Sequence, residues 1–179
     1  EEHPSDPARN AYERGLEETE LEDYGAAQAA YAEALSLDPT YSTAAYNLGV
    51  SLVRLGRDEE AVAAFERAVT IDPTSVDALY NVGLLRYQRR EFDAALGAFR
   101  RARVLAPREF DLTKKIVQSL HALGRFDEAA VERREARRVR ACSDRADVRE
   151  MTAFVIDQLE VDGEMVYVYE IFEPDPQWT

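Results

Sequence analysis

Apolar and small residues recur along the chain with a period of thirty-four residues. The run AAYNLG at residues 44–49 returns as ALYNVG at residues 78–83. Further along, the apolar and small positions of residues 60–68 return at residues 94–102. The repeats end in prolines, at Pro39, Pro73 and Pro107. Self-similarity at a fixed period of this length predicts a protein built from stacked structural repeats.

Within one period, the apolar residues have helical spacing, which predicts two antiparallel helices. Small residues at three positions allow these helices to approach closely, and an aromatic residue should fill the space that the next repeat's first helix closes over. These positions hold Gly15, Gly49 and Gly83 (position 8), Ala27, Ala61 and Ala95 (position 20), Tyr31, Phe65 and Phe99 (position 24), and Ala34, Ala68 and Ala102 (position 27). Proline ends each second helix because it lacks the amide proton. We expect at least seven helices within residues 8–141.

These residues resemble the tetratricopeptide-repeat (TPR) family. The resemblance implies an all-α, right-handed superhelical solenoid with three clear repeats, 8–41, 42–75 and 76–109, and a degenerate fourth, 110–143. The fourth has Val117, Arg133 and Ala141 where the others have glycine, an aromatic residue and proline. Arg133 predicts that no fifth repeat follows. The arginine-rich stretch 133–140 is then either a solvated last helix or an electropositive docking surface.

Outside the repeats, we expect a flexible segment at residues 1–7 and an extension at 144–179. In that extension the pattern changes from helical to alternating, and Asp162-Gly163 predicts a β-hairpin over about 152–173. An unbroken register pairs Glu160 with Met165, Gln158 with Tyr167, Ile156 with Tyr169 and Phe154 with Ile171. A lone hairpin is marginal in water. It therefore covers the last helices, pairs with a partner strand, or begins a further β domain.

Charge divides the chain into three sections. The net charge of −13 comes from residues 1–40, with eleven acids and two bases, and from residues 144–179, with ten acids and two bases. Residues 41–143 carry eighteen bases and fourteen acids. The overall acidity argues against general affinity for nucleic acid or an anionic membrane.

Signatures of catalysis are missing from the sequence. Cys142 is the one cysteine and has no recognisable histidine partner, and no zinc spacing, phosphate loop or nucleophile elbow occurs. The turn at Asp162-Gly163 lacks the carboxylates of a calcium loop. We therefore expect no enzymatic activity and no cofactor. No apolar run is long enough to span a membrane, and Glu1 in place of methionine indicates that the natural start has been removed, which leaves export open.

The TPR resemblance implies that the first helices line a concave groove that binds a protein or peptide segment. The candidate residues are Tyr12, Tyr46, Asn47, Val50, Tyr80, Asn81, Leu84, Tyr87, Lys114, Lys115 and Gln118. Tyrosine offers contact area and a hydroxyl, and asparagine can donate to and accept from an extended backbone. The alternative is that the tyrosines are ordinary packing residues. Lys114 and Lys115 suit an acidic segment.

These features predict a non-catalytic scaffold for protein–protein interaction. Two alternatives stay open: a TPR arm of a larger protein whose β or catalytic domain continues beyond residue 179, and an assembly or chaperone subunit. TPR domains that clamp the carboxylate tails of heat-shock chaperones carry basic residues and asparagines at set positions. Of these positions only Asn47 matches, while Tyr12, Leu16, Asp77 and Asn81 depart from the pattern.

Overall fold

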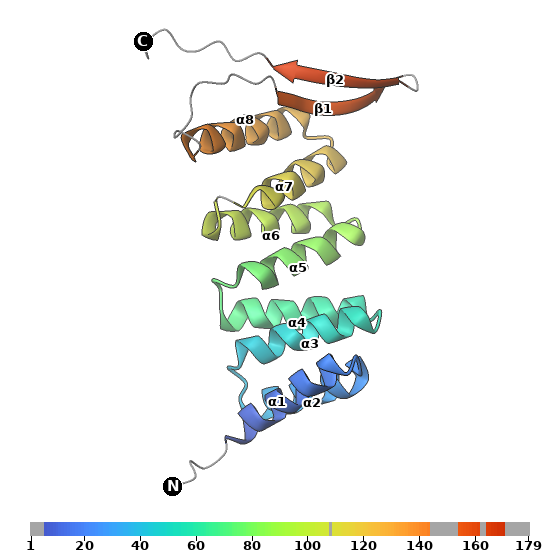
Figure 1. The fold of residues 1–179 in the computed structure, drawn as a ribbon, viewed down its shortest axis with the longest axis vertical. Helices are drawn as coiled ribbons and strands as arrows, with labels where there is room; N and C mark the ends of the chain where they lie inside the picture. The colour runs from blue at the N-terminus through green and yellow to red at the C-terminus, as the bar shows by residue number, and fades with distance from the viewer. Residues whose placement is uncertain (1–5, 108, 144–153, 162–163, 171–179) are drawn as a thin grey trace. The chain divides into compact units, whose positions relative to one another are not determined.

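The computed structural model of the chain describes residues 6–107, 109–143, 154–161 and 164–170. Within these ranges lie eight α-helices and two β-strands (Figure 1). The helices are α1 (Pro7–Glu20), α2 (Tyr24–Leu37), α3 (Ser42–Arg54), α4 (Asp58–Ile71), α5 (Val76–Gln88), α6 (Phe92–Leu105), α7 (Phe110–Ala122) and α8 (Phe126–Ser143). The expectation of at least seven helices in residues 8–141 is confirmed.

Helix starts follow from local capping chemistry. The α1 helix begins at Pro7, within the segment expected to be flexible, because the Asp6 side chain accepts a hydrogen bond from the Ala8 amide at 3.0 Å. Proline suits this first helical position, because a backbone N–H group there would have no hydrogen-bond partner within the helix. The side chains of Asp23 and Ser75 cap α2 and α5 in the same way. The flexible segment at 1–7 therefore does not include Pro7, and residues 1–5 lie outside the described residues.

The turn between the two helices of each repeat adopts a left-handed backbone conformation at the same position. Glycine occupies it in repeats 2 and 4, with φ of 71° at Gly56 and 72° at Gly124. Repeats 1 and 3 place Glu22 (φ 60°) and Arg90 (φ 63°) there. Residues with a Cβ have a strained backbone at positive φ, because the Cβ comes close to the following carbonyl oxygen. The repeat geometry therefore imposes this conformation even where the residue does not favour it.

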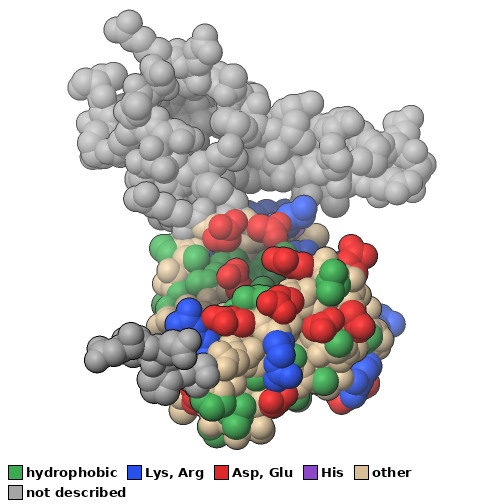
Figure 2. Space-filling model, turned by 60° about the horizontal axis from the view of Figure 1, so that its bottom comes forward, with side chains coloured by type: hydrophobic (Ala, Val, Ile, Leu, Met, Phe, Trp, Pro, Cys, Tyr) green, Lys and Arg blue, Asp and Glu red, His purple; other side chains and the backbone are tan. Residues whose placement is uncertain are grey.

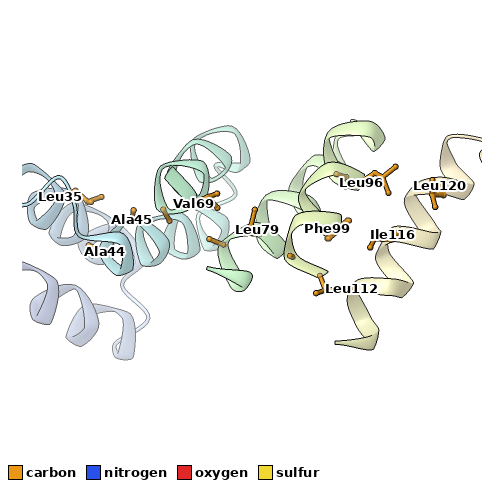
Figure 3. Close-up of a cluster of buried hydrophobic side chains, with 14 of the residues drawn as sticks. Leu35, Ala44, Ala45, Val69, Leu79, Leu96, Phe99, Leu112, Ile116 and Leu120 are labelled. Carbon is orange, nitrogen blue, oxygen red and sulfur yellow. The ribbon is translucent and has the colours of Figure 1, made fainter. Parts of the chain in front are cut away.

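Consecutive helices pack on one another from α1 to α7, and their buried side chains form a hydrophobic core. Figure 3 shows part of one cluster passing from repeat to repeat, from Leu35 through Val69 and Leu79 to Leu120. Each buried aromatic at position 24 lies against the glycine of its own repeat. A Cβ added to Gly15, Gly49 or Gly83 would come within 2.5, 2.7 and 2.6 Å of the ring of Tyr31, Phe65 and Phe99. The predicted close approach of the two helices is confirmed.

The aromatic residue at position 24 makes contacts both within its own repeat and with the next repeat. Phe65 was predicted to be closed over by the first helix of the next repeat, and it does share a cluster with Val82 and Leu85 of α5. Its ring also lies against Gly49 of α3, in its own repeat. One ring thus joins the helices within a repeat and contacts the following repeat.

The contacts divide the chain into two compact parts, residues 1–138 and 139–179. In the second part, β1 (Phe154–Val161) and β2 (Glu164–Glu170) pair antiparallel, with Glu160 opposite Met165 and Gln158 opposite Tyr167 as expected. The rest of the expected register is wrong. Val155, not Ile156, lies opposite Tyr169, and Phe154 lies opposite Glu170, not Ile171.

The register changes because of an irregularity between Val155 and Asp157, where an extra residue interrupts the ladder as in a β-bulge. The turn residues 162–163 and the strand ends at 152–153 and 171–173 lie outside the described residues. The role of this hairpin stays a prediction.

Candidate functional site

The expected groove residues all lie on the first helices of the repeats. Tyr12 is on α1, Tyr46, Asn47 and Val50 are on α3, Tyr80, Asn81, Leu84 and Tyr87 are on α5, and Lys114, Lys115 and Gln118 are on α7. We call this set of eleven side chains the first-helix face. Because each repeat contributes at equivalent positions, the face is a periodic surface that follows the stack of helices.

Hydrogen bonds join the face from one repeat to the next. The side-chain Nδ2 of Asn47 donates to the Tyr12 hydroxyl at 3.1 Å, and Nδ2 of Asn81 donates to the Tyr46 hydroxyl at 3.5 Å. In repeat 4 the equivalent position holds Lys115, and the hydroxyl of Tyr80 instead donates to the Asp111 carboxylate at 2.6 Å. The tyrosines and asparagines therefore form one ladder that fixes the spacing of the first helices.

The tyrosine rings are packed as well as bonded. The ring centroids of Tyr12, Tyr46 and Tyr80 lie 5.7, 5.5 and 5.8 Å from those of the position-24 aromatics of their own repeats, Tyr31, Phe65 and Phe99. Burial, followed by the hydrogen bond to Asp111, raises the pKa of Tyr80 to about 12. These three tyrosines thus have the packing role that the sequence analysis left open, and their hydroxyls are already engaged.

Other groups on this side of the first helices are exposed or lack a hydrogen-bond partner among the described residues. The apolar side chains of Leu16 and Val53 are each 38% exposed, and those of Val50 and Leu84 are half-buried. Within the described part of the chain, the amide oxygen of Asn47 accepts no hydrogen bond, so it could accept one from a bound backbone. Apolar contact area with a few fixed polar groups is the usual composition of a binding surface.

The charge of the first helices changes sign along the stack. On α1 the exposed Glu13 pairs with Arg9 at 2.9 Å, and Figure 2, which turns the N-terminal end forward, shows acidic side chains spread over that end. On α7, Lys114 and Gln118 are exposed and Lys115 is half-buried, and neither lysine has an ion-pair partner among the described residues. Among the described residues, the first helices therefore carry acidic groups at the α1 end and two ammonium groups without an ion-pair partner at the α7 end.

An ion-pair network between repeats 3 and 4 was not predicted from the sequence. The Glu132 carboxylate of α8 is buried and pairs with Arg103 and, at 3.2 Å, with Arg100, both on α6. Glu128 lies 3.3 Å from Arg100. A signal was present in the sequence. The repeat position of Glu132 holds Ala30, Ala64 and Ala98 in the other repeats, and that of Arg103 holds Leu35 and Val69.

Two classes of site find no support among the described residues. They contain no group of three or more histidine, cysteine, aspartate or glutamate side chains arranged to hold a metal ion. None of the described helices combines the length and the apolar character needed to cross a membrane.

Eight helices stacked in pairs, with one ladder of contacts along their first helices, define a helical repeat protein. A family model described as tetratricopeptide repeat matches residues 10–76 and 77–143, and the chain belongs to this family. No curated protein matches the sequence.

Several solved structures share the fold. One structure of MamA is 21% identical and has a TM-score of 0.70, with 78% of this chain and 82% of that chain covered. The first TPR of Spaghetti (RPAP3), bound to the HSP90 peptide SRMEEVD, is 21% identical with a TM-score of 0.62, covering 69% and 99%. The Arabidopsis OM64 TPR domain is 23% identical with a TM-score of 0.55, covering 68% and 95%. At these identities the likeness shows the fold alone.

Proposed function

We propose that this protein is a non-catalytic interaction module that binds a protein or peptide segment along its first-helix face. TPR proteins are generally scaffolds, and the structure of the RPAP3 domain holds a peptide. The observation that carries the proposal is the Tyr–Asn ladder. It links the first helices of repeats 1 to 3, and the bond from Tyr80 to Asp111 extends the contact to repeat 4, while the side-chain oxygen of Asn47 accepts no hydrogen bond within the described part of the chain and the aliphatic side chains stay exposed.

The chemistry of the face indicates what kind of segment fits. Val50 and Leu84 of the face, together with Leu16 and Val53 on the same side of these helices, offer apolar contact along α1, α3 and α5. Lys114 and Lys115 on α7 favour carboxylates at that end. We infer an extended or helical segment with apolar side chains and an acidic end directed toward repeat 4. Charge at the rim of such a surface contributes mainly to orientation and association rate.

Affinity purification with the intact chain tests this proposal when matched variants serve as comparison baits. Val53→Glu places a charge on α3, on the side of the first-helix face, at a side chain that is 38% exposed, and Val104→Glu makes the same change on α6 at a side chain that is 80% exposed. A genuine partner should be captured by the parent and by Val104→Glu but lost with Val53→Glu. Partners that are captured equally by both variants would remove the case for this face.

Charge reversal tests the orientation. Lys114→Glu should weaken binding of a captured acidic segment by about tenfold, because it replaces an attraction with a repulsion. Arg134→Glu is the control, since Arg134 is exposed on the arginine-rich stretch of α8. Weakening by Arg134→Glu and not by Lys114→Glu would assign the partner to the arginine-rich helix. Isothermal titration calorimetry with the captured segment measures the dissociation constant of each variant.

A further inference from the structure

A hollow of about 860 Å³ lies between repeats 2 and 3, away from the first-helix face. Its walls come from the second helices α4 and α6, with α5 between them, and it contains none of the eleven side chains of that face. Val69, Leu79 and Val82, all largely buried, form its apolar lining, and Glu66, Arg86 and Arg101 contribute charge. Small-molecule pockets have volumes of ~300–1,000 Å³, so the hollow is large enough to accept a side chain.

Repeat 3 has smaller side chains than repeat 2 at two of the positions that line the hollow. The position of Gly97 holds Ala63 in repeat 2, and the position of Ala94 holds Glu60. A Cβ added to Gly97 would have no atom within 4 Å, so the space beside α6 is open. Glycine is a poor residue for the middle of a helix, and no close approach of another helix requires it here.

Charges around the hollow are unevenly matched. Arg86 pairs with Glu66, at 2.7 Å, and with Glu91, so its single positive charge is already matched by two carboxylates. Arg101 is exposed and has no hydrogen-bond or ion-pair partner among the described residues. Its counterpart in repeat 2, Arg67, donates to the backbone carbonyls of Leu35 and Pro39 at 3.3 and 3.5 Å. The guanidinium of Arg101 is thus the unmatched charge at this site.

We propose that this hollow is a second docking site, which accepts a segment of a partner protein carrying a large apolar side chain beside an aspartate or glutamate. The apolar side chain occupies the space next to Gly97 and contacts Val69 and Val82. The neighbouring carboxylate pairs with Arg101, whose planar guanidinium binds carboxylates with two hydrogen bonds. This site is separate from the first-helix face, so the two can be occupied at the same time.

Selection from a random dodecapeptide library displayed on phage tests the proposal on the full chain. Bound peptides are then measured by fluorescence anisotropy against four variants. Gly97→Leu places a bulky side chain in the hollow, Gly97→Ala adds one methyl group at the same position, Arg101→Glu reverses the rim charge, and Val53→Glu adds a charge to α3 on the side of the first-helix face. Gly97 is exposed and has open space around it, so Gly97→Leu should melt at the parent's temperature or above it.

The expected result is a class of peptides with an acidic residue next to leucine, isoleucine or phenylalanine. Gly97→Leu should abolish their binding and Arg101→Glu should weaken it about tenfold, while Gly97→Ala and Val53→Glu leave it close to the parent value. Peptides that bind Gly97→Leu as tightly as the parent overturn the proposal, as does a selection that enriches no such class. Peptides lost only with Val53→Glu overturn it as well, and support the first-helix face instead.

Discussion

Removing either member of the Arg103–Glu132 ion pair alone should destabilise the junction of repeats 3 and 4, and replacing both should restore it. Two earlier junctions supply the design. The equivalent positions hold Leu35 and Ala64 between repeats 1 and 2, and Val69 and Ala98 between repeats 2 and 3, all buried. The double variant Arg103→Val with Glu132→Ala therefore recreates the second junction at the third.

Burial of the charges sets the size of the effect. The Glu132 side chain is 8% exposed, whereas Arg103 and Arg100 are 27% and 37% exposed. Leaving a fully buried charge without its partner costs ~3–5 kcal/mol, but a solvent-exposed pair contributes ~1 kcal/mol or less. Because the arginines here can reach water, we expect each single variant to lose about 2 kcal/mol. The double variant should lie about 1 kcal/mol below the parent, which corresponds to a coupling energy of about 3 kcal/mol.

Urea unfolding followed by circular dichroism measures the free energy of unfolding of the four proteins, and hydrogen exchange of α8 amides reports on repeat 4 by itself. Raising the salt concentration to about 1 M screens charges, so it should weaken the parent's junction and leave that of the double variant unchanged. Val69→Ala is the control, since it truncates the apolar counterpart and should respond to salt no more than the double variant does. Additive single effects, with a coupling energy below about 0.5 kcal/mol, would refute this account of the junction.

Three further predictions concern the repeats. Gly83→Ala should destabilise the protein by ~1–3 kcal/mol because its Cβ would lie 2.6 Å from the ring of Phe99, whereas Gly97→Ala should stabilise it by ~0.5–1 kcal/mol, and thermal melts that shift in the same direction would contradict this. Arg90→Gly should stabilise by ~1 kcal/mol by relieving the left-handed turn, and no gain in urea midpoint would show that the turn is unstrained. The hydroxyl and amide of Thr74 hold the pKa of Asp72 below its ordinary 3.8, so its contribution to stability should be complete above that pH and lost as pH falls through the folded-state value. Melts of Asp72→Asn should then depend less on pH in this acidic range than those of the parent, and equal slopes would exclude the effect.

Packing positions were predictable from sequence because they recur. Gly49 and Phe65, for example, belong to patterns seen three times each, and a contact made in every repeat leaves the same signature in every repeat. The hydrogen bonds of the first-helix face were not predictable, although their residues were. Asn47 was expected to serve a bound backbone, and its amide nitrogen instead donates to Tyr12, thirty-five residues earlier in the chain.

What the sequence by itself determined is the number of repeats, their helix pairs and the faces those helices bury, because helical spacing and the 34-residue period encode them locally. Only the tertiary structure decided which side chains meet across a junction. The pairing of Glu132 with Arg103 and the open space beside Gly97 depend on how two neighbouring repeats stack. Glu132 replaces the alanine of the other repeats, and Arg103 replaces leucine or valine. Each substitution is explained by the other, because the two side chains form an ion pair. The stacking of α6 and α8 brings these two side chains together.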